Sequence, residues 1–147
     1  MEYKTIKINN FDTEKGTFYG YASIFNVEDS YNDIVLAGTF RDSLILKNAK
    51  DIKMFWQHNQ KIEIGKYIDI HEDQIGLFVE GQIDIVNNYK NYSLVKNNFV
   101  NGLSIGYKAD KFKFDKKGRR ILEKINLLEI SLVKFPANKL SNITYCI

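Results

Sequence analysis

The sequence has little cysteine, proline or histidine and no long hydrophobic run, and each shortage excludes a class of structure. Cys146 is the only cysteine, which excludes an intrachain disulfide framework and a cysteine-based metal cluster and favours a reducing compartment. Pro136 is the only proline, and no linker or low-complexity tract interrupts the chain. The apolar runs are short, Met54-Phe55-Trp56 among them, so no segment could cross a bilayer or act as a secretory signal.

What is present fits one compact globular domain over residues 1–147. The 147 residues are 44% hydrophobic and 27% charged, enough for a sizeable core. The net charge of +3 is small compared with the dense basic stripe of a duplex DNA binder. Most of the excess lies in residues 108–120, where lysines are interleaved with Phe112 and Phe114 before a turn at Lys117-Gly118. We interpret this segment as a hairpin with one solvated face rather than as a nucleic-acid-binding arm.

The hydrophobic periodicity indicates a mainly β protein. Alternating apolar and polar residues, rich in Ile, Val, Tyr and Phe, predict strands over residues 3–9, 17–25, 52–57, 62–70, 75–85, 103–114 and 120–134. Helical spacing is found after Gly38 up to about residue 49, with Thr39 as the N-cap, and again over residues 87–99. We expect both helices to bury their apolar faces, formed by Phe40, Leu44 and Ile45 in the first and by Tyr89, Tyr92, Val95 and Phe99 in the second. The predicted fold is an α+β antiparallel β-barrel with two or more peripheral helices.

Histidine is scarce, which narrows the search for a catalytic base. Only His58 and His71 occur, and a serine nucleophile usually needs a histidine as its base. His58 follows the apolar run 54–56, where a buried strand reaches the edge of the core, and is the better candidate. His71 lies in an acidic polar turn, where a solvated surface histidine is expected.

The candidate nucleophile is Ser104, in Gly102-Leu103-Ser104-Ile105-Gly106. In a strand, Gly102 and Gly106 share the face of Ser104, and we expect these glycines to leave room for a substrate backbone. Taken alone, the pentapeptide favours a bulged strand with an incidental serine, because so short a pattern often arises by chance. The nucleophile elbow of α/β-hydrolases is excluded, since its histidine follows the serine and its strands alternate with helices.

A third residue should orient the histidine, and Glu129 is the best candidate. It lies in the apolar run 127–133, which predicts an interior strand, and a carboxylate buried there needs a partner. A histidine N–H fits that need, and so, equally, do a lysine or backbone amides. Ser131 faces the same way and is an alternative as a supporting hydrogen-bond donor.

Metal and phosphate chemistry find little support in the sequence. There is no His-x-x-x-His motif, no cysteine pair and no glycine-rich phosphate loop. Glu28, Asp29 and Asp33 form at most a loose acidic loop. We therefore expect neither a metal nor a cofactor.

Taken together, the motifs resemble the tailed-phage prohead (procapsid) maturation serine proteases, which are similar in fold to herpesvirus assemblins. The resemblance covers nearly the whole chain and is carried by seven short pieces in order. They are Gly20-Tyr21-Ala22-Ser23-Ile24-Phe25; Asp33 with Gly38-Thr39-Phe40; Trp56-Gln57-His58-Asn59; Ile64-Gly65; Gly76-Leu77; Gly102-Leu103-Ser104-Ile105-Gly106-Tyr107; and Leu128-Glu129-Ile130-Ser131-Leu132-Val133 with Pro136-Ala137-Asn138. Family members commonly continue beyond this last motif, whereas the sequence ends at Ile147.

The resemblance implies an assemblin-like barrel and a serine endopeptidase with His58, Ser104 and, less securely, Glu129 as its catalytic residues. Its expected partner is the major capsid protein with its scaffolding segment, which it would cleave inside the procapsid in the host cytoplasm, along with itself. Homo-oligomers are compatible with this prediction, whereas nucleic acid and membrane are not expected as partners.

Two functions from other classes stay open. One is a catalytically silent capsid-assembly module of the same fold. The other is a barrel that binds single-stranded nucleic acid through aromatic platforms, because 14% of the residues are aromatic. We rank it low because most of these aromatics fall at predicted core positions.

Overall fold

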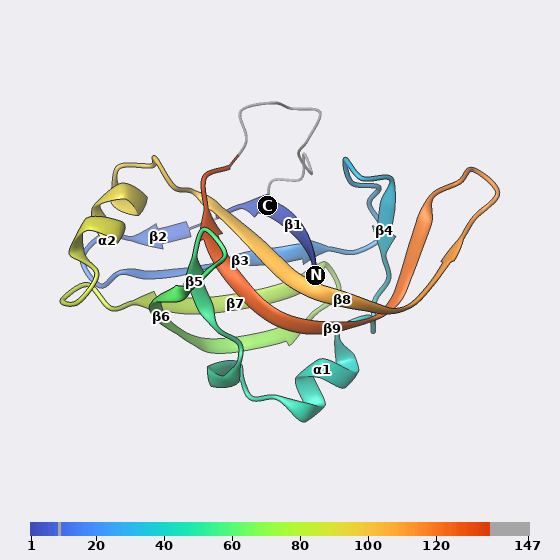
Figure 1. Ribbon diagram of the computed structural model, residues 1–147, viewed down its shortest axis with the longest axis horizontal. Helices are drawn as coiled ribbons and strands as arrows, with labels where there is room; N and C mark the ends of the chain where they lie inside the picture. Colours follow the sequence, from blue (N-terminus) through green and yellow to red (C-terminus); the bar gives the residue numbers. More distant parts are fainter. Residues whose placement is uncertain (9, 136–147) are drawn as a thin grey trace.

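The computed structural model describes residues 1–8 and 10–135, which form a curled half-barrel sheet with two α-helices (Figure 1). The strands are β1 (Glu2–Lys7), β2 (Asn10–Asp12), β3 (Thr17–Ile24), β4 (Asp33–Val35), β5 (Met54–Trp56), β6 (Asn59–Glu72), β7 (Gly76–Ile83), β8 (Gly102–Phe114) and β9 (Arg120–Val133). The helices are α1 (Arg41–Leu46) and α2 (Tyr89–Lys96), with a short 3-10 turn η1 (Ala49–Asp51). The predicted mainly β class with two helices is confirmed. Within the described ranges, no helix is both long and apolar enough to span a membrane.

The sheet brings three distant parts of the chain side by side. Its strand order is β1-β8-β9-β5-β6-β7-β3-β2, and β4 pairs with β9 from outside this path. Most pairs are antiparallel, but β4 and β5 run parallel to β9. The β8–β9 hairpin extends beyond the sheet (Figure 1) and turns at Gly118, as predicted. The N-terminal strand, residues 102–106 and residues 129–133 are therefore neighbours.

In the parts of β8 and β9 that lie within the sheet, every second side chain contributes to the hydrophobic core. Leu103 and Ile105 on β8, and Ile130 and Leu132 on β9, are fully buried. Burial of each such side chain stabilises the fold by about 1.5–3 kcal/mol. Since successive side chains of a strand point to opposite faces, this alternation directs residue 104 and its neighbours on β9 to the other face of the sheet.

Both helices bury less than their sequence pattern predicts. Ile45 is 74% exposed, and Tyr89 and Phe99 are also exposed. The reason is length, because α1 has only six residues and α2 ends before Phe99, so a full apolar stripe cannot form. Thr39 is not a helix cap, since its hydroxyl donates to the Leu122 carbonyl of β9 at 2.8 Å.

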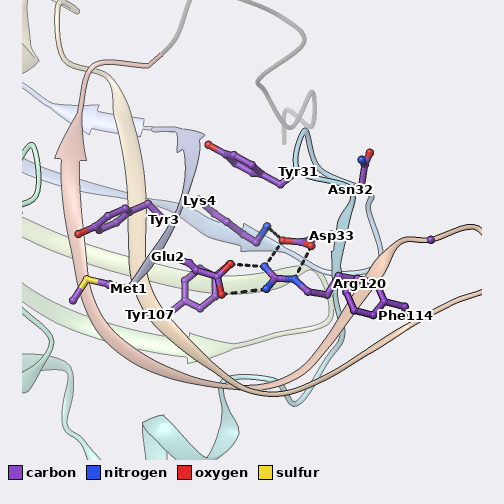
Figure 2. A pocket seen from close by; sticks show the side chains of 11 residues that line it. Met1, Glu2, Tyr3, Lys4, Tyr31, Asn32, Asp33, Tyr107, Phe114 and Arg120 are labelled. Carbon is purple, nitrogen blue, oxygen red and sulfur yellow. Dashed lines mark hydrogen bonds and ion pairs between the residues drawn. The ribbon is translucent and has the colours of Figure 1, made fainter.

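A buried ionic cluster fastens the N-terminal strand to the rest of the sheet (Figure 2). The Lys4 ammonium donates to Asp29 and, at 2.7 Å, to Asp33. Arg120 of β9 donates to Asp33 at 2.8 and 2.9 Å and to Glu2 at 2.5 and 3.2 Å. Burial opposes ionisation of Asp33, but the hydrogen bonds from Arg120 and Lys4 outweigh it and hold the pKa of this carboxyl below its usual value. Asp29 and Asp33 are thus structural partners of Lys4 rather than a loose acidic loop.

Candidate active site

His58 sits on a tight turn between β5 and β6, above the strands that carry the other candidates. Trp56 pairs with Asn59, so Gln57 and His58 form a two-residue hairpin turn. Both have positive φ, at 54° and 61°, as the twist of such a turn requires. The Gln57 amide donates to the Leu132 carbonyl of β9 at 2.9 Å. This backbone hydrogen bond attaches the turn to β9. It therefore fixes the position of the backbone from which the His58 side chain extends.

The structure brings the three predicted residues into one hydrogen-bonded line. In the β8–β9 ladder, Ser104 pairs with Ser131 and Gly106 pairs with Glu129. His58 Nε2 lies 2.9 Å from Ser104 Oγ, and His58 Nδ1 is hydrogen-bonded to Glu129 Oε1. The Ser131 hydroxyl donates to the same Glu129 oxygen at 2.8 Å. Glu129 is thus the hydrogen-bond partner of His58, and Ser131 is the donor that supports Glu129.

The hydrogen bonds determine what this line can do chemically. A carboxylate at Glu129 accepts, so His58 carries its proton on Nδ1 and leaves Nε2 free to accept the Ser104 proton. Glu129 is only 2% exposed, and its charge acts on its surroundings, since burial and this carboxylate raise the pKa of Tyr67 well above its ordinary value. The arrangement is that of a serine activated by an oriented histidine.

His71 lies away from this line. Its side chain is half exposed and contacts Asp69 at 2.8 Å, as the sequence predicts for a solvated histidine. Among residues 1–8 and 10–135, no cluster of three or more His, Cys, Asp or Glu side chains could hold a metal ion.

The glycines beside Ser104 serve a different purpose from the one predicted. A Cβ at Gly106 would lie 2.6 Å from Glu129 Cγ, and one at Gly102 would lie 3.2–3.3 Å from Thr5, Val133 and Phe135. Ser104 itself is 0% exposed. The glycines therefore make room for the protein's own side chains, above all Glu129, and the expectation of an open approach for a substrate is wrong for this conformation.

Gly106→Ala should consequently impair the site. The added methyl would push Glu129 away from His58, and a misplacement of about 1 Å in such a site can lower the rate about 10²-fold. If this line is catalytic, kcat on a peptide substrate should fall by about this factor. Gly102→Ala is the matched control, because its closest contacts are looser and its loss of kcat should be several-fold smaller. Equal losses in the two variants would contradict this role of Gly106.

Tyr3 is a site residue that sequence reasoning missed. It pairs with Gly106 across the β1–β8 ladder, and its ring centroid lies 3.9 Å from that of His58. No local motif marks it, because the contact depends on pairing between strands about 100 residues apart in the chain. A tyrosine near an N-terminus has no pattern that would predict such a position.

Comparison with known proteins shows the family of this chain. The family model of caudovirus prohead serine proteases matches residues 3–146. The chain belongs to this family. Over 137 residues it is 34% identical to the prohead protease of Enterobacteria phage HK97, covering 90% of this chain and 60% of that protein. Over 122 residues it is 28% identical to the prohead protease of Escherichia phage T5, covering 82% of this chain and 58% of that protein.

The family member described here therefore spans about 60% of the length of these relatives. In structure it is similar to the capsid assembly protease of bacteriophage T4, with a TM-score of 0.73 at 9% identity over 92% of this chain and 100% of that one. This likeness shows a shared fold. The protease of varicella-zoster virus aligns with a TM-score of 0.44 at 14% identity, over 79% of this chain and 56% of that one.

Proposed function

We propose that this prohead protease family member is a serine endopeptidase that matures phage procapsids. Ser104 is the nucleophile, His58 the general base and Glu129 the group that orients His58. The observation that carries the proposal is the hydrogen-bonded line Ser104–His58–Glu129 on one face of β8 and β9. Membership of the prohead serine protease family supports the same reaction.

The proposed chemistry is acyl transfer in two halves. His58 Nε2 takes the proton of Ser104 as Oγ attacks the scissile carbonyl, and it then gives that proton to the leaving amine. Water repeats the sequence on the acyl-enzyme, which releases the new carboxylate and restores Ser104. Glu129 stabilises the imidazolium in both halves, and Ser131 holds Glu129 in place.

The proposed substrates are phage capsid proteins, which lose their scaffolding segments, and the protease itself. The relatives from HK97 and T5 are prohead proteases, and the similar T4 structure is a capsid assembly protease. The protein would act inside the assembling procapsid in the host cytoplasm, with the major capsid protein as partner.

The test is processing of a capsid protein that still carries its scaffolding segment, mixed with the purified protein and followed by mass spectrometry. Wild-type protein should release the segment, whereas Ser104→Ala should reduce the rate by at least about 10³-fold, because a nucleophile has no substitute. Ser93→Ala on α2, outside the Ser104–His58–Glu129 line, is the control and should cleave normally. The same samples without capsid protein report self-cleavage. A normal processing rate with Ser104→Ala would refute the assignment of Ser104 as the nucleophile, whereas no processing by the folded wild type would favour a catalytically silent assembly module.

A further inference from the structure

The proposed nucleophile is closed off from solvent in this conformation. Ser104 is 0% exposed, and the imidazole of His58 is 20% exposed. A peptide carbonyl has to come within van der Waals contact of Ser104 Oγ before attack. If Ser104 acts as the nucleophile, some side chain above it has to move first.

The N-terminal strand lies beside Ser104 and contacts His58. Tyr3 and Thr5 of β1 pair with Gly106 and Ser104 of β8, so all four side-chain positions share one face of the sheet. The ring of Tyr3 lies over His58, with the two ring planes inclined by 43°. Tyr3 is also 41% exposed, so its ring has the imidazole on one side and solvent on the other.

The two residues that flank Tyr3 in the chain, Glu2 and Lys4, are both held by ion pairs. Lys4 is bound to Asp29 and Asp33, and Glu2 is bound to Arg120. Figure 2 shows the side chains of Glu2, Lys4, Asp33 and Arg120 on one side of β1, while Tyr3 points to the other side. Moving the strand would break a buried ionic cluster, whereas turning the Tyr3 side chain about its own bonds leaves the cluster intact. Such rotamer changes of exposed side chains are fast, on the picosecond to nanosecond scale.

We propose that the Tyr3 ring is a gate over Ser104 and His58: it closes the site as seen here and turns outward into solvent to admit the substrate. The inference rests on the proposed function, in that it is this active site that the gate closes. With the gate closed most of the time, the rate of any reaction at position 104 equals the rate in the open state multiplied by the fraction of molecules that are open. Removing the ring should remove that reduction.

The experiment measures access to position 104 without relying on catalysis. In a Ser104→Cys, Cys146→Ser protein the only thiol is at position 104, and its alkylation by iodoacetamide is followed by mass spectrometry. Adding Tyr3→Ala should speed alkylation about tenfold, the preference for the closed state that one aromatic contact can supply. Tyr3→Thr, whose β-branched side chain favours a strand, should do the same. Tyr3→Phe keeps the ring and should stay within about twofold of the parent.

Tyr19→Ala is the matched control, because Tyr19 is similarly exposed, at 48%, but lies on β3 and should leave the rate unchanged. The urea unfolding midpoint of each variant shows that the fold is kept. Equal or slower alkylation in both Tyr3→Ala and Tyr3→Thr would overturn the gate. Labelling of unaltered Ser104 by a fluorophosphonate probe reports separately on the nucleophile. If neither wild type nor Tyr3→Ala is labelled at Ser104, the proposed function fails, while the thiol rates still decide the gate.

Discussion

Glu129→Gln is expected to lower kcat by about 10⁴-fold while KM changes little. The side chain keeps its shape, but an amide in this position can donate its N–H to His58 Nδ1. The imidazole then carries its proton on Nε2 and cannot accept the proton of Ser104. Binding should survive because Glu129 is buried beneath His58, with no surface for a substrate. The measurement is steady-state kinetics on a peptide that spans a capsid cleavage site.

Glu123→Gln provides the control on the same strand. Glu123 is a partly exposed residue of β9 that pairs with Lys111 and Lys113, so its loss should leave kcat within about twofold, as for other surface charges. Glu129→Gln should also keep the fold, which the unfolding midpoint verifies. If kcat fell less than tenfold in a folded Glu129→Gln protein, Glu129 would be a structural carboxylate and not the partner that orients His58.

The composition of the chain made part of this site predictable. With two histidines in the sequence, the choice of base came down to His58 or His71, and their neighbours along the chain differ in polarity. The glycine neighbours point to Ser104, although these glycines make room for the protein's own side chains rather than for a substrate. The sequence could not show whether Glu129 pairs with His58 or with a lysine. The hydrogen bond that decides this joins residues 71 positions apart in the chain, and hydrophobic periodicity carries no information about such a distant contact.

For the fold as well, features that depend on neighbouring residues were predictable from the sequence, whereas features that depend on distant contacts were not. Alternation along β8 and β9 predicted both strands and their turn near Gly118, because that hairpin is local in the chain. The exposure of Ile45 and Phe99 was not predictable, since it depends on how soon each helix ends. Lys4 shows most clearly what the sequence alone cannot predict. An alternating sequence places it on the inner face of β1, and only the tertiary fold reveals the two aspartates that make this burial possible.

Lys4→Met is expected to destabilise the protein by about 3–5 kcal/mol, the range for breaking a buried ion pair from one side. Methionine fills much of the same space, so the loss is electrostatic. Lys4 is 4% exposed, and without its ammonium the Asp29 carboxylate keeps the backbone amides of Tyr31 and Asp33 as donors but loses the cation that faces it. The free energy of unfolding, measured in urea at neutral pH, reports the effect.

Lys7→Met isolates the contribution of burial, because Lys7 lies on the same strand but is exposed and its replacement should change stability by less than about 0.5 kcal/mol. The second variant is Lys4→Met with Asp29→Asn. Removing the unpaired charge together with its partner should recover much of the loss, since replacing both partners avoids a buried, uncompensated group. A single Lys4→Met change that cost less than about 1 kcal/mol, as exposed ion pairs do, would show that the cluster does not anchor β1. The rigid strand on which the Tyr3 gate turns would then have to be held by its pairing with β8 alone.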